Sequence, residues 1–308
     1  MKTLTIIHSL SAVIILAGLA GSPAGAQQNT NTLAVGAIQP LPVLTEKFVA
    51  AGKAMSLRQV VGVMNEQLMD RLNATRKFKI MAGTDLKEII KAQELANSGN
   101  YTLQDPNTAK QFQLAGIKWS LQTTLDDFED QTERLADKPA RTLTTKRTVR
   151  LGVTCKLFDT TTGGMLESAS QVLNTNSIVE TLLEASNNAE ATDELLRRVT
   201  RDMAEWVAVR VANVAFPVKV LAKTDKMVTL NRGEGSGVAV GQLWNANAPG
   251  KELKDPDTGE VLGREEIPVG KIRITEVQPK FSKGEIIGED LGVDIGAILR
   301  LPPPSKAP

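Results

Sequence analysis

The spacing of apolar residues along this chain changes from helical to alternating and back again. Residues 57–72 carry apolar side chains three or four positions apart: Leu57, Val60, Val61, Met64, Leu68 and Leu72. This spacing predicts an amphipathic helix with one face on a core. Ser56 followed by Gln59 has the form of a capping box, which places the start of the helix at Ser56. Residues 193–215 predict a second long helix with the same apolar spacing.

Alternation with a period of two predicts the strands of a sheet. The predicted strands are two short apolar runs, 33–38 and 78–81, and three longer segments, 119–125, 146–158 and 165–173. Pro40 and Pro42 predict a loop, residues 160–164 a turn, and the polar residues 129–145 an exposed hairpin tip. Two shorter helices are expected from Thr84 and from Asp105. The order of these elements predicts an α/β sandwich, with one mixed sheet and helices mainly on one face.

Beyond Phe216-Pro217, the predicted domain boundary, the helical spacing disappears. Five short strands separated by glycines are expected at 218–222, 227–231, 242–245, 269–277 and 297–301. Such strands with glycine turns favour a small all-β, barrel-like domain. The chain thus divides into a signal peptide (1–26), an α/β domain (27–216), a small β-domain (217–301) and a disordered proline-rich tail (302–308).

The first 26 residues have the pattern of a secretory signal peptide. Lys2 precedes an apolar run over residues 10–19, and small residues stand at Ala24 and Ala26. A retained membrane anchor is the alternative, but a span needs about 20 apolar residues, and polar Ser11 interrupts this run. Cleavage leaves 308 − 26 = 282 residues. We expect a protein of the periplasm, with peripheral association with the outer membrane left open.

Composition argues against catalysis and against nucleic acid as a partner. His8, the only histidine, lies in the signal peptide, and Cys155 is the only cysteine. The exported chain therefore lacks the commonest general base and metal ligand. Lys and Arg total 36 against 35 Asp and Glu, and removal of Lys2 leaves 35 against 35. A neutral chain exerts no long-range attraction on nucleic acid or anionic lipid. We expect no enzyme, no cofactor, and no catalytic, cofactor-binding or metal-binding residues.

Three motifs suggest chemistry but have simpler structural explanations. The glycine-rich residues 233–237 resemble a phosphate loop, but no helix is predicted after them, so turn glycines with positive φ are expected. Residues 255–266 resemble a calcium loop, but Gly259 stands where an oxygen ligand belongs, so a hairpin turn is expected. The acidic residues within 126–130 would suit paired catalytic carboxylates, yet a solvated strand end is the usual explanation for such a run.

Apolar neighbours place the remaining unusual side chains in a core. Cys155 alternates with apolar strand residues, which predicts a small buried side chain rather than a reactive thiol. Trp119, Trp206 and Trp244 lie on apolar faces. We expect them to pack internally and not to form a platform for stacking sugars or bases.

Several short segments follow one another in an order that is typical of envelope assembly proteins. They are 33–38, a helix ending at 68–72, 77–80, 84–90, 115–116 leading into a strand that ends at 125–128, 153–159 and 163–167. In this pattern residues 33–215 resemble the curli production assembly/transport (CsgG-like) family. Residues 230–233, 237–241 and 255–260 are similar to the C-terminal domain of flagellar assembly protein T. Both resemblances imply cell-envelope assembly factors rather than enzymes. We expect protein partners and a homo-oligomeric state.

The chain departs from the curli family at two points. The curli secretion protein is a lipoprotein, whereas no cysteine lies near the expected cleavage point here. That protein also builds an outer-membrane pore from strand hairpins, and a membrane strand needs about 9–11 residues with a continuously apolar face. In residues 121–133, Asp127, Glu129 and Glu133 occupy one face, whereas Asp126 and Asp130 occupy the other.

We therefore predict an exported, non-catalytic assembly or accessory factor of the bacterial cell envelope. It would bind protein partners through exposed sheet edges and loops such as residues 129–145. Two alternatives stay open: an oligomeric outer-membrane secretion pore subunit, and an envelope hydrolase that uses carboxylates.

Overall fold

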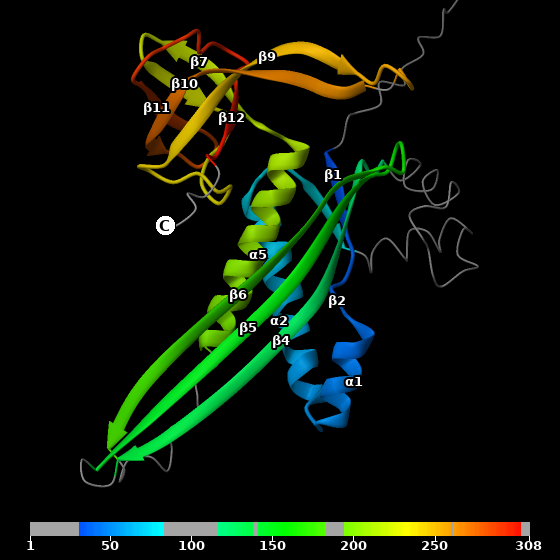
Figure 1. Ribbon diagram of the computed structural model, residues 1–308, viewed down its shortest axis with the longest axis vertical. Coiled ribbons are helices and arrows are strands. Elements are labelled where there is room, and N and C mark those ends of the chain that lie inside the picture. The colour runs from blue at the N-terminus through cyan, green and yellow to red at the C-terminus, as the bar shows by residue number, and fades with distance from the viewer. Residues whose placement is uncertain (1–30, 83–115, 138–140, 183–193, 260, 303–308) are drawn as a thin grey trace, which may run out of the picture.

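A mixed six-stranded sheet with helices packed on one face is followed by a closed six-stranded barrel (Figure 1). The computed structural model describes residues 31–82, 116–137, 141–182, 194–259 and 261–302. The strand order in the sheet is β3-β1-β4-β5-β6, and β2 pairs with β4. The predicted mixed α/β class is confirmed. The signal peptide, the helices expected from Thr84 and Asp105, and residues 303–308 lie outside the described residues.

The first elements of the chain are short strands and two helices. β1 (Thr32–Val35) pairs in parallel with β3 (Lys79–Ala82) and with the start of β4, and β2 (Gln39–Pro40) pairs with β4 further along. The loop predicted at Pro40 and Pro42 is wrong, because Pro40 ends strand β2 and Pro42 begins helix α1 (Pro42–Ala50). Proline suits this position because the first helical turn does not need its N–H group.

Helix α2 (Ala54–Ala74) begins two residues before the predicted capping box. Its N-cap is Lys53, which makes no side-chain hydrogen bond to the helix end. Gly52 has a φ of 69° and turns the chain sharply between α1 and α2, so Ser56 already lies in the first turn of α2. The predicted apolar face is confirmed, because the buried residues of α2 are Leu57, Val60, Met64, Leu68 and Leu72.

Three long antiparallel strands form most of the sheet: β4 (Trp119–Asp137), β5 (Thr142–Asp159) and β6 (Met165–Leu182). The hairpin tip predicted over residues 129–145 is wrong, because β4 and β5 stay paired as far as Asp137 and Thr142. Continued main-chain pairing satisfies every backbone group between the two strands, whatever the polarity of their side chains.

A bulge in β4 changes which side chains face the helices. The register with β5 shifts between Leu125 and Asp127. An extra residue in one strand reverses the alternation beyond it. Consequently Leu125 before the bulge and Phe128 after it are both buried, although an odd and an even position would otherwise face opposite ways.

Helix α5 (Glu194–Ala215) confirms the second long helix and packs with α2 against the sheet. On β5, the side chains that face these helices are buried: Val149, Leu151, Val153, Cys155 and Leu157. The intervening Arg150 and Lys156 are exposed on the opposite face of β5. Among the described residues, the helices therefore cover one face of the sheet. Trp119 is buried in this core and Trp206 packs against it, as predicted.

The barrel contains six strands in the order β10-β11-β8-β7-β12-β9. They are β7 (Val218–Thr224), β8 (Met227–Leu230), β9 (Leu243–Lys254), β10 (Val261–Val277), β11 (Ser282–Ile287) and β12 (Ile298–Arg300). The sequence pattern missed β11, where Gly284 stands at a core position. A Cβ there would lie 2.5 Å from Cγ2 of Ile272, so the close approach requires glycine. Trp244 is buried in the barrel core, as predicted.

A glycine turn packs the barrel against the helices. Gly235 and Gly237 have φ values of 69° and 81°, so the predicted turn glycines are confirmed. A Cβ on Gly235 would lie 3.1 Å from Cβ of Ala74 in α2, and one on Gly237 would lie 2.5 Å from Cγ1 of Val209 in α5. These glycines thus serve the contact between the two parts of the molecule, and the residues after them continue as turn and coil rather than as a helix.

Two basic side chains cross the same junction. Nη2 of Arg232, a fully buried residue, donates to the carbonyl oxygens of Ala212, at 2.7 Å, and Phe216 at the end of α5. Nζ of Lys77 donates to the carbonyl oxygen of Asn231 at 2.6 Å. Burial, and then the nearby charge of Arg232, lower the pKa of Lys77. The barrel is therefore held to the α/β part by buried polar contacts as well as by packing.

Candidate interaction surface

The three long strands continue past the helices that cover the sheet (Figure 1). We call the continuing part the strand extension and define it as residues 131–137 of β4, 142–148 of β5 and 176–182 of β6, which are paired with one another. In β4 every residue of the extension is exposed. Both faces of β4 are therefore solvated here, and the extension lies well away from the barrel (Figure 1).

Polar and charged side chains stabilise the extension from both faces. Arg147 in β5 forms two hydrogen bonds with the Asp130 carboxylate just before the extension, at 2.8 and 2.6 Å. Glu133 lies directly opposite Lys146 on the other face. Opposite charges across a strand pair favour the pairing, and β-branched threonines, which recur in β5, suit a strand. These pairings explain how a polar segment stays extended beyond the helices that the structure describes.

The extension carries two strand edges without a partner among the described residues. β6 is the last strand in the order, so its outer edge is unpaired along Met165–Leu182. β2 ends at Pro40, opposite Leu125, so β4 loses its outer partner beyond that point. Natural sheets commonly protect such edges with proline, lysine or a bulge. β6 contains no proline, lysine, arginine or glycine, and at about 3.4 Å per residue its edge is about 60 Å long.

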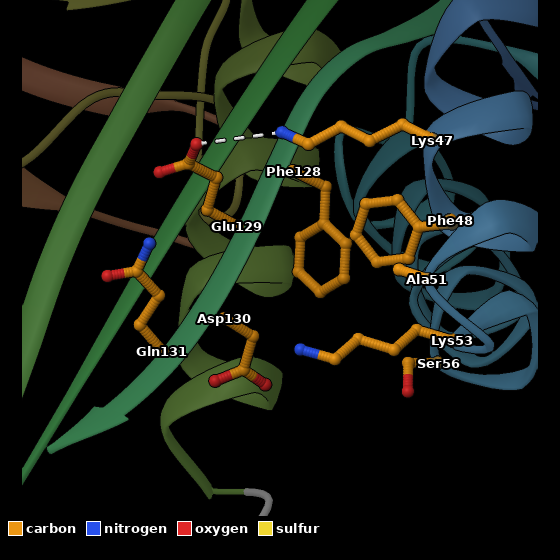
Figure 2. A pocket seen from close by; sticks show the side chains of 9 residues that line it. All are labelled: Lys47, Phe48, Ala51, Lys53, Ser56, Phe128, Glu129, Asp130 and Gln131. Carbon is orange, nitrogen blue, oxygen red and sulfur yellow. Dashed lines mark ion pairs between the residues drawn. The ribbon is translucent and has the colours of Figure 1, made fainter.

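A small pocket lies where the outer edge of β4 leaves the helices (Figure 2). Its volume is about 280 Å³, and its wall is formed by Phe48 and Phe128, whose rings stack with centroids 5.5 Å apart. Nζ of Lys47 lies 3.8 Å from Oε1 of Glu129 at the rim. Figure 2 shows the Lys53 side chain reaching from the helices toward Asp130. The pocket brings opposite charges together above an apolar wall and holds no pair of carboxylates facing one another.

The acidic run of β4 is distributed over separate cationic or hydroxyl partners. Asp127 pairs with Nε of Arg150 at 2.8 Å, Glu129 with Lys47, and Asp130 with Arg147. Asp126, at the bulge, accepts a hydrogen bond from the Thr154 hydroxyl. These contacts join neighbouring strands and join α1 to β4. They explain the carboxylates as part of the scaffold, but the predicted strand end is wrong, because residues 126–130 lie in the middle of β4 and stay paired with β5 beyond them.

The calcium-like residues form the turn that joins β9 to β10. Oδ1 of Asp255 accepts hydrogen bonds from the N–H groups of Asp257, at 2.8 Å, and Thr258, at 2.9 Å. These two N–H groups lower the pKa of Asp255 because they stabilise its carboxylate. Gly259 has a φ of 72° and completes the turn. The hairpin turn predicted from Asp-Pro and Thr-Gly is confirmed.

Within the described ranges, no group of three His, Cys, Asp or Glu side chains is placed to hold a metal ion. In that same part of the chain, no helix has the length and apolar character needed to cross a membrane.

Cys155 is buried between β4 and β6, as predicted, and burial raises the pKa of its thiol to about 11. Since the thiolate is the reactive form, we expect N-ethylmaleimide at about pH 8 to label the unfolded chain fully and the folded chain hardly at all. Mass spectrometry of both samples measures this. Rapid labelling of the folded protein would contradict the burial.

The raised pKa of Cys155 also predicts a loss of folding stability between about pH 9 and about pH 11, because the thiol of the unfolded chain ionises at a lower pH than the thiol of the folded chain.

Comparison with solved structures finds distant likenesses to several bacterial proteins. No protein-family model and no curated protein matches the chain. Lipoprotein GNA1162 from Neisseria meningitidis is 14% identical, with a TM-score of 0.28 over 57% of this chain and 97% of its own. The PelC dodecamer from Paraburkholderia phytofirmans is 12% identical, with a TM-score of 0.30 over 61% and 90%. The LpoB C-terminal domain from Salmonella enterica is 10% identical, with a TM-score of 0.22 over 47% and 83%. These TM-scores are too low to carry a functional conclusion.

Proposed function

We propose that this protein is an exported, non-catalytic assembly or accessory factor of the bacterial cell envelope that works by binding other proteins through its strand extension. The observation that carries the proposal is that the outer edges of β4 and β6 have no strand partner in the part of the chain that the structure describes. An exposed edge offers a row of N–H and C=O groups to which another chain can add a strand. The signal-peptide pattern of residues 1–26 supports export.

The chemistry of the described residues supports binding rather than turnover. The carboxylates of β4 have separate partners, and the thiol of Cys155 is buried. General acid–base catalysis needs a titratable group within reach of a substrate proton. The residues that line the pocket beside β4 include no histidine or cysteine, and its two acids are Glu129 and Asp130, which are paired with Lys47 and Arg147.

The barrel gives the extension a fixed base. Arg232 and the glycine turn hold the barrel on α5 and α2, and α5 in turn packs along β5 and β6. A partner bound to the barrel would therefore be held at a set distance from one bound to the extension. In this proposal the barrel is a second docking site.

The alternative of an outer-membrane pore subunit needs a lipid-facing side on the projecting strands. Glu129, Gln131 and Glu133 occupy one face of β4, whereas Asp130 and its partner Arg147 lie on the other. On the lipid face near the membrane centre, an Arg or Lys side chain costs about 2–4 kcal/mol, and an acidic side chain costs less but is still destabilising. This charge distribution favours an aqueous surface that binds protein.

Photo-crosslinking tests the proposal in cells that export the protein. A photoreactive amino acid at Gln131 or Leu135, both exposed in the extension, is expected to form adducts with other polypeptides. Met55 in α2, which is outside both the extension and the barrel and is similarly exposed at 70% against 69% for Leu135, is the matched control position. An extension that forms no more adducts than Met55 would overturn the proposed surface. Ion conductance of the purified protein in planar bilayers would favour the pore instead.

A further inference from the structure

The middle of β6 reads almost the same in both chain directions. Around Thr175 the order of residues is Val-Leu-Asn-Thr-Asn-Ser-Ile, from Val172 to Ile178. When such a strand pairs antiparallel with a copy of itself about Thr175, Val172 lies opposite Ile178 of the second copy. Asn174 then lies opposite Asn176 of the second copy. Both pairs occur twice, because the arrangement has twofold symmetry.

We propose that two copies of this chain join their β6 edges in an antiparallel pair, with a twofold axis passing next to Thr175. This rests on the proposed function and names a second copy as the partner of the β6 edge. The two sheets would become one continuous sheet, with the main-chain groups of both edges paired.

The side chains that would meet across this pair are exposed on the surface. Val172, Asn174, Asn176 and Ile178 are all exposed and lie on the same face, opposite alternate residues of β5. Val172 is 50% exposed and Ile178 is 65% exposed. In the pair, each apolar side chain covers an apolar one, and the asparagine amides between them both donate and accept hydrogen bonds. The exposed face of β6 is therefore complementary to itself.

Strand direction favours this pairing over a ring of upright copies. β4 and β6 both run antiparallel to β5, so they run in the same direction as each other. A ring that joins β6 of one copy to β4 of the next would therefore need a parallel junction, whereas β6 with β6 is antiparallel. Antiparallel pairing is slightly more stable per residue.

The helices leave room for the second copy and predict a salt effect. α5 lies over one half of β6, since Arg210 binds Glu167 at 2.7 Å and Arg198 contacts the Thr175 hydroxyl at 3.3 Å. Beyond Thr175 the strand extension continues past α5. In the pair, the extension of each copy lies beside the helix-covered half of the other. The two Arg198 side chains approach the axis from the same face, so salt that screens them should strengthen the pair.

Distances between two copies test the register directly. Spin labels can be attached to Val172→Cys or to Ser168→Cys, which are both exposed positions on one face. Pulsed electron paramagnetic resonance then measures the distance between the equivalent labels of the two copies. A twofold axis at Thr175 and about 3.4 Å per residue predict about 20 Å for Val172→Cys and about 48 Å for Ser168→Cys. A monomer in light scattering at about 100 μM, or distances that do not increase in this order, would overturn the proposal.

Charge variants test the same contact without labels. The double variant Val172→Lys with Ile178→Lys places like charges opposite each other, so we expect the dissociation constant of the dimer to rise at least about tenfold. When this variant is mixed with the double variant Val172→Glu with Ile178→Glu, opposite charges meet and a heterodimer should form. A misfolded variant could not form this heterodimer. Val43→Lys on α1, 75% exposed, is the matched control and should stay dimeric. If the chain is monomeric while Gln131 and Leu135 still crosslink to other proteins, the self-pairing fails and the proposed function stands.

Discussion

Replacing Arg232 with alanine is expected to lower the free energy of unfolding by about 4 kcal/mol, one of the two largest effects that we predict. Arg232 is fully buried, and its Nη2 donates to the carbonyls of Ala212 and Phe216 and, at 3.1 Å, to Oδ1 of Asn213. Each buried acceptor left without a donor costs about 1–3 kcal/mol, and the missing side chain leaves a cavity.

Two further properties of Arg232 bear on this magnitude. Burial lowers its pKa to about 10, so the guanidinium stays charged at neutral pH and complements the carbonyl end of α5. Its Nε and Nη1 lack partners among the described residues, so part of the charge is desolvated without compensation. This uncompensated cost reduces the net stabilisation that Arg232 provides. The expected loss therefore stays at about 4 kcal/mol, below the summed cost of three acceptors left without a donor.

Urea denaturation followed by circular dichroism measures the effect of Arg232→Ala. Arg273→Ala, at an exposed position in barrel strand β10, is the matched control and should change the unfolding free energy by less than about 0.5 kcal/mol. An equal decrease in the unfolding free energy of both variants would show that Arg232 does not connect the barrel to α5 as described. If the barrel of Arg232→Ala unfolds in a separate transition at a lower urea concentration, that result supports the connection.

Replacing Trp119 with alanine is expected to cost about 3–5 kcal/mol. Trp119 is buried at the start of β4 and contacts two aromatic rings edge to face, those of Phe78 at 5.8 Å and Phe216 at 5.1 Å between centroids. Phe216 also contacts Phe78 at 5.4 Å, so the three rings form a closed cluster. This cluster joins the base of the sheet to the end of α5, where the chain enters the barrel.

Thermal and urea unfolding test the aromatic cluster. Leu135→Ala, exposed in the strand extension, should change stability by less than about 0.5 kcal/mol and is the control. A double-mutant cycle of Trp119→Ala with Phe216→Ala should yield a coupling of about 0.5–1.5 kcal/mol, because the two rings touch. Additive losses would contradict a direct ring contact.

The strand extension shows where sequence patterns lead to a wrong prediction. Residues 129–145 are polar and charged, so their pattern predicts a loop, yet β4 and β5 pair through nearly all of them. The pairing partners of Glu129 and Asp137 are Arg150 and Thr142. Cross-strand pairing depends on residues that are distant in the chain, which a local pattern does not contain. The same applies to β11, whose Gly284 is required by Ile272 of a neighbouring strand.

The amino-acid sequence alone determined the local elements and the limits on chemistry. Helical spacing identified α2 and α5, alternation identified the core of β5, and the lack of histidine beyond His8 argued against catalysis. These properties depend on neighbouring residues or on composition, so they are visible without a fold. Only the tertiary structure decided that Arg232 is buried and that, within the described ranges, β4 loses its outer partner and β6 ends the sheet. Each of these depends on which distant segments meet, and therefore on the sum of many weak contacts across the whole chain.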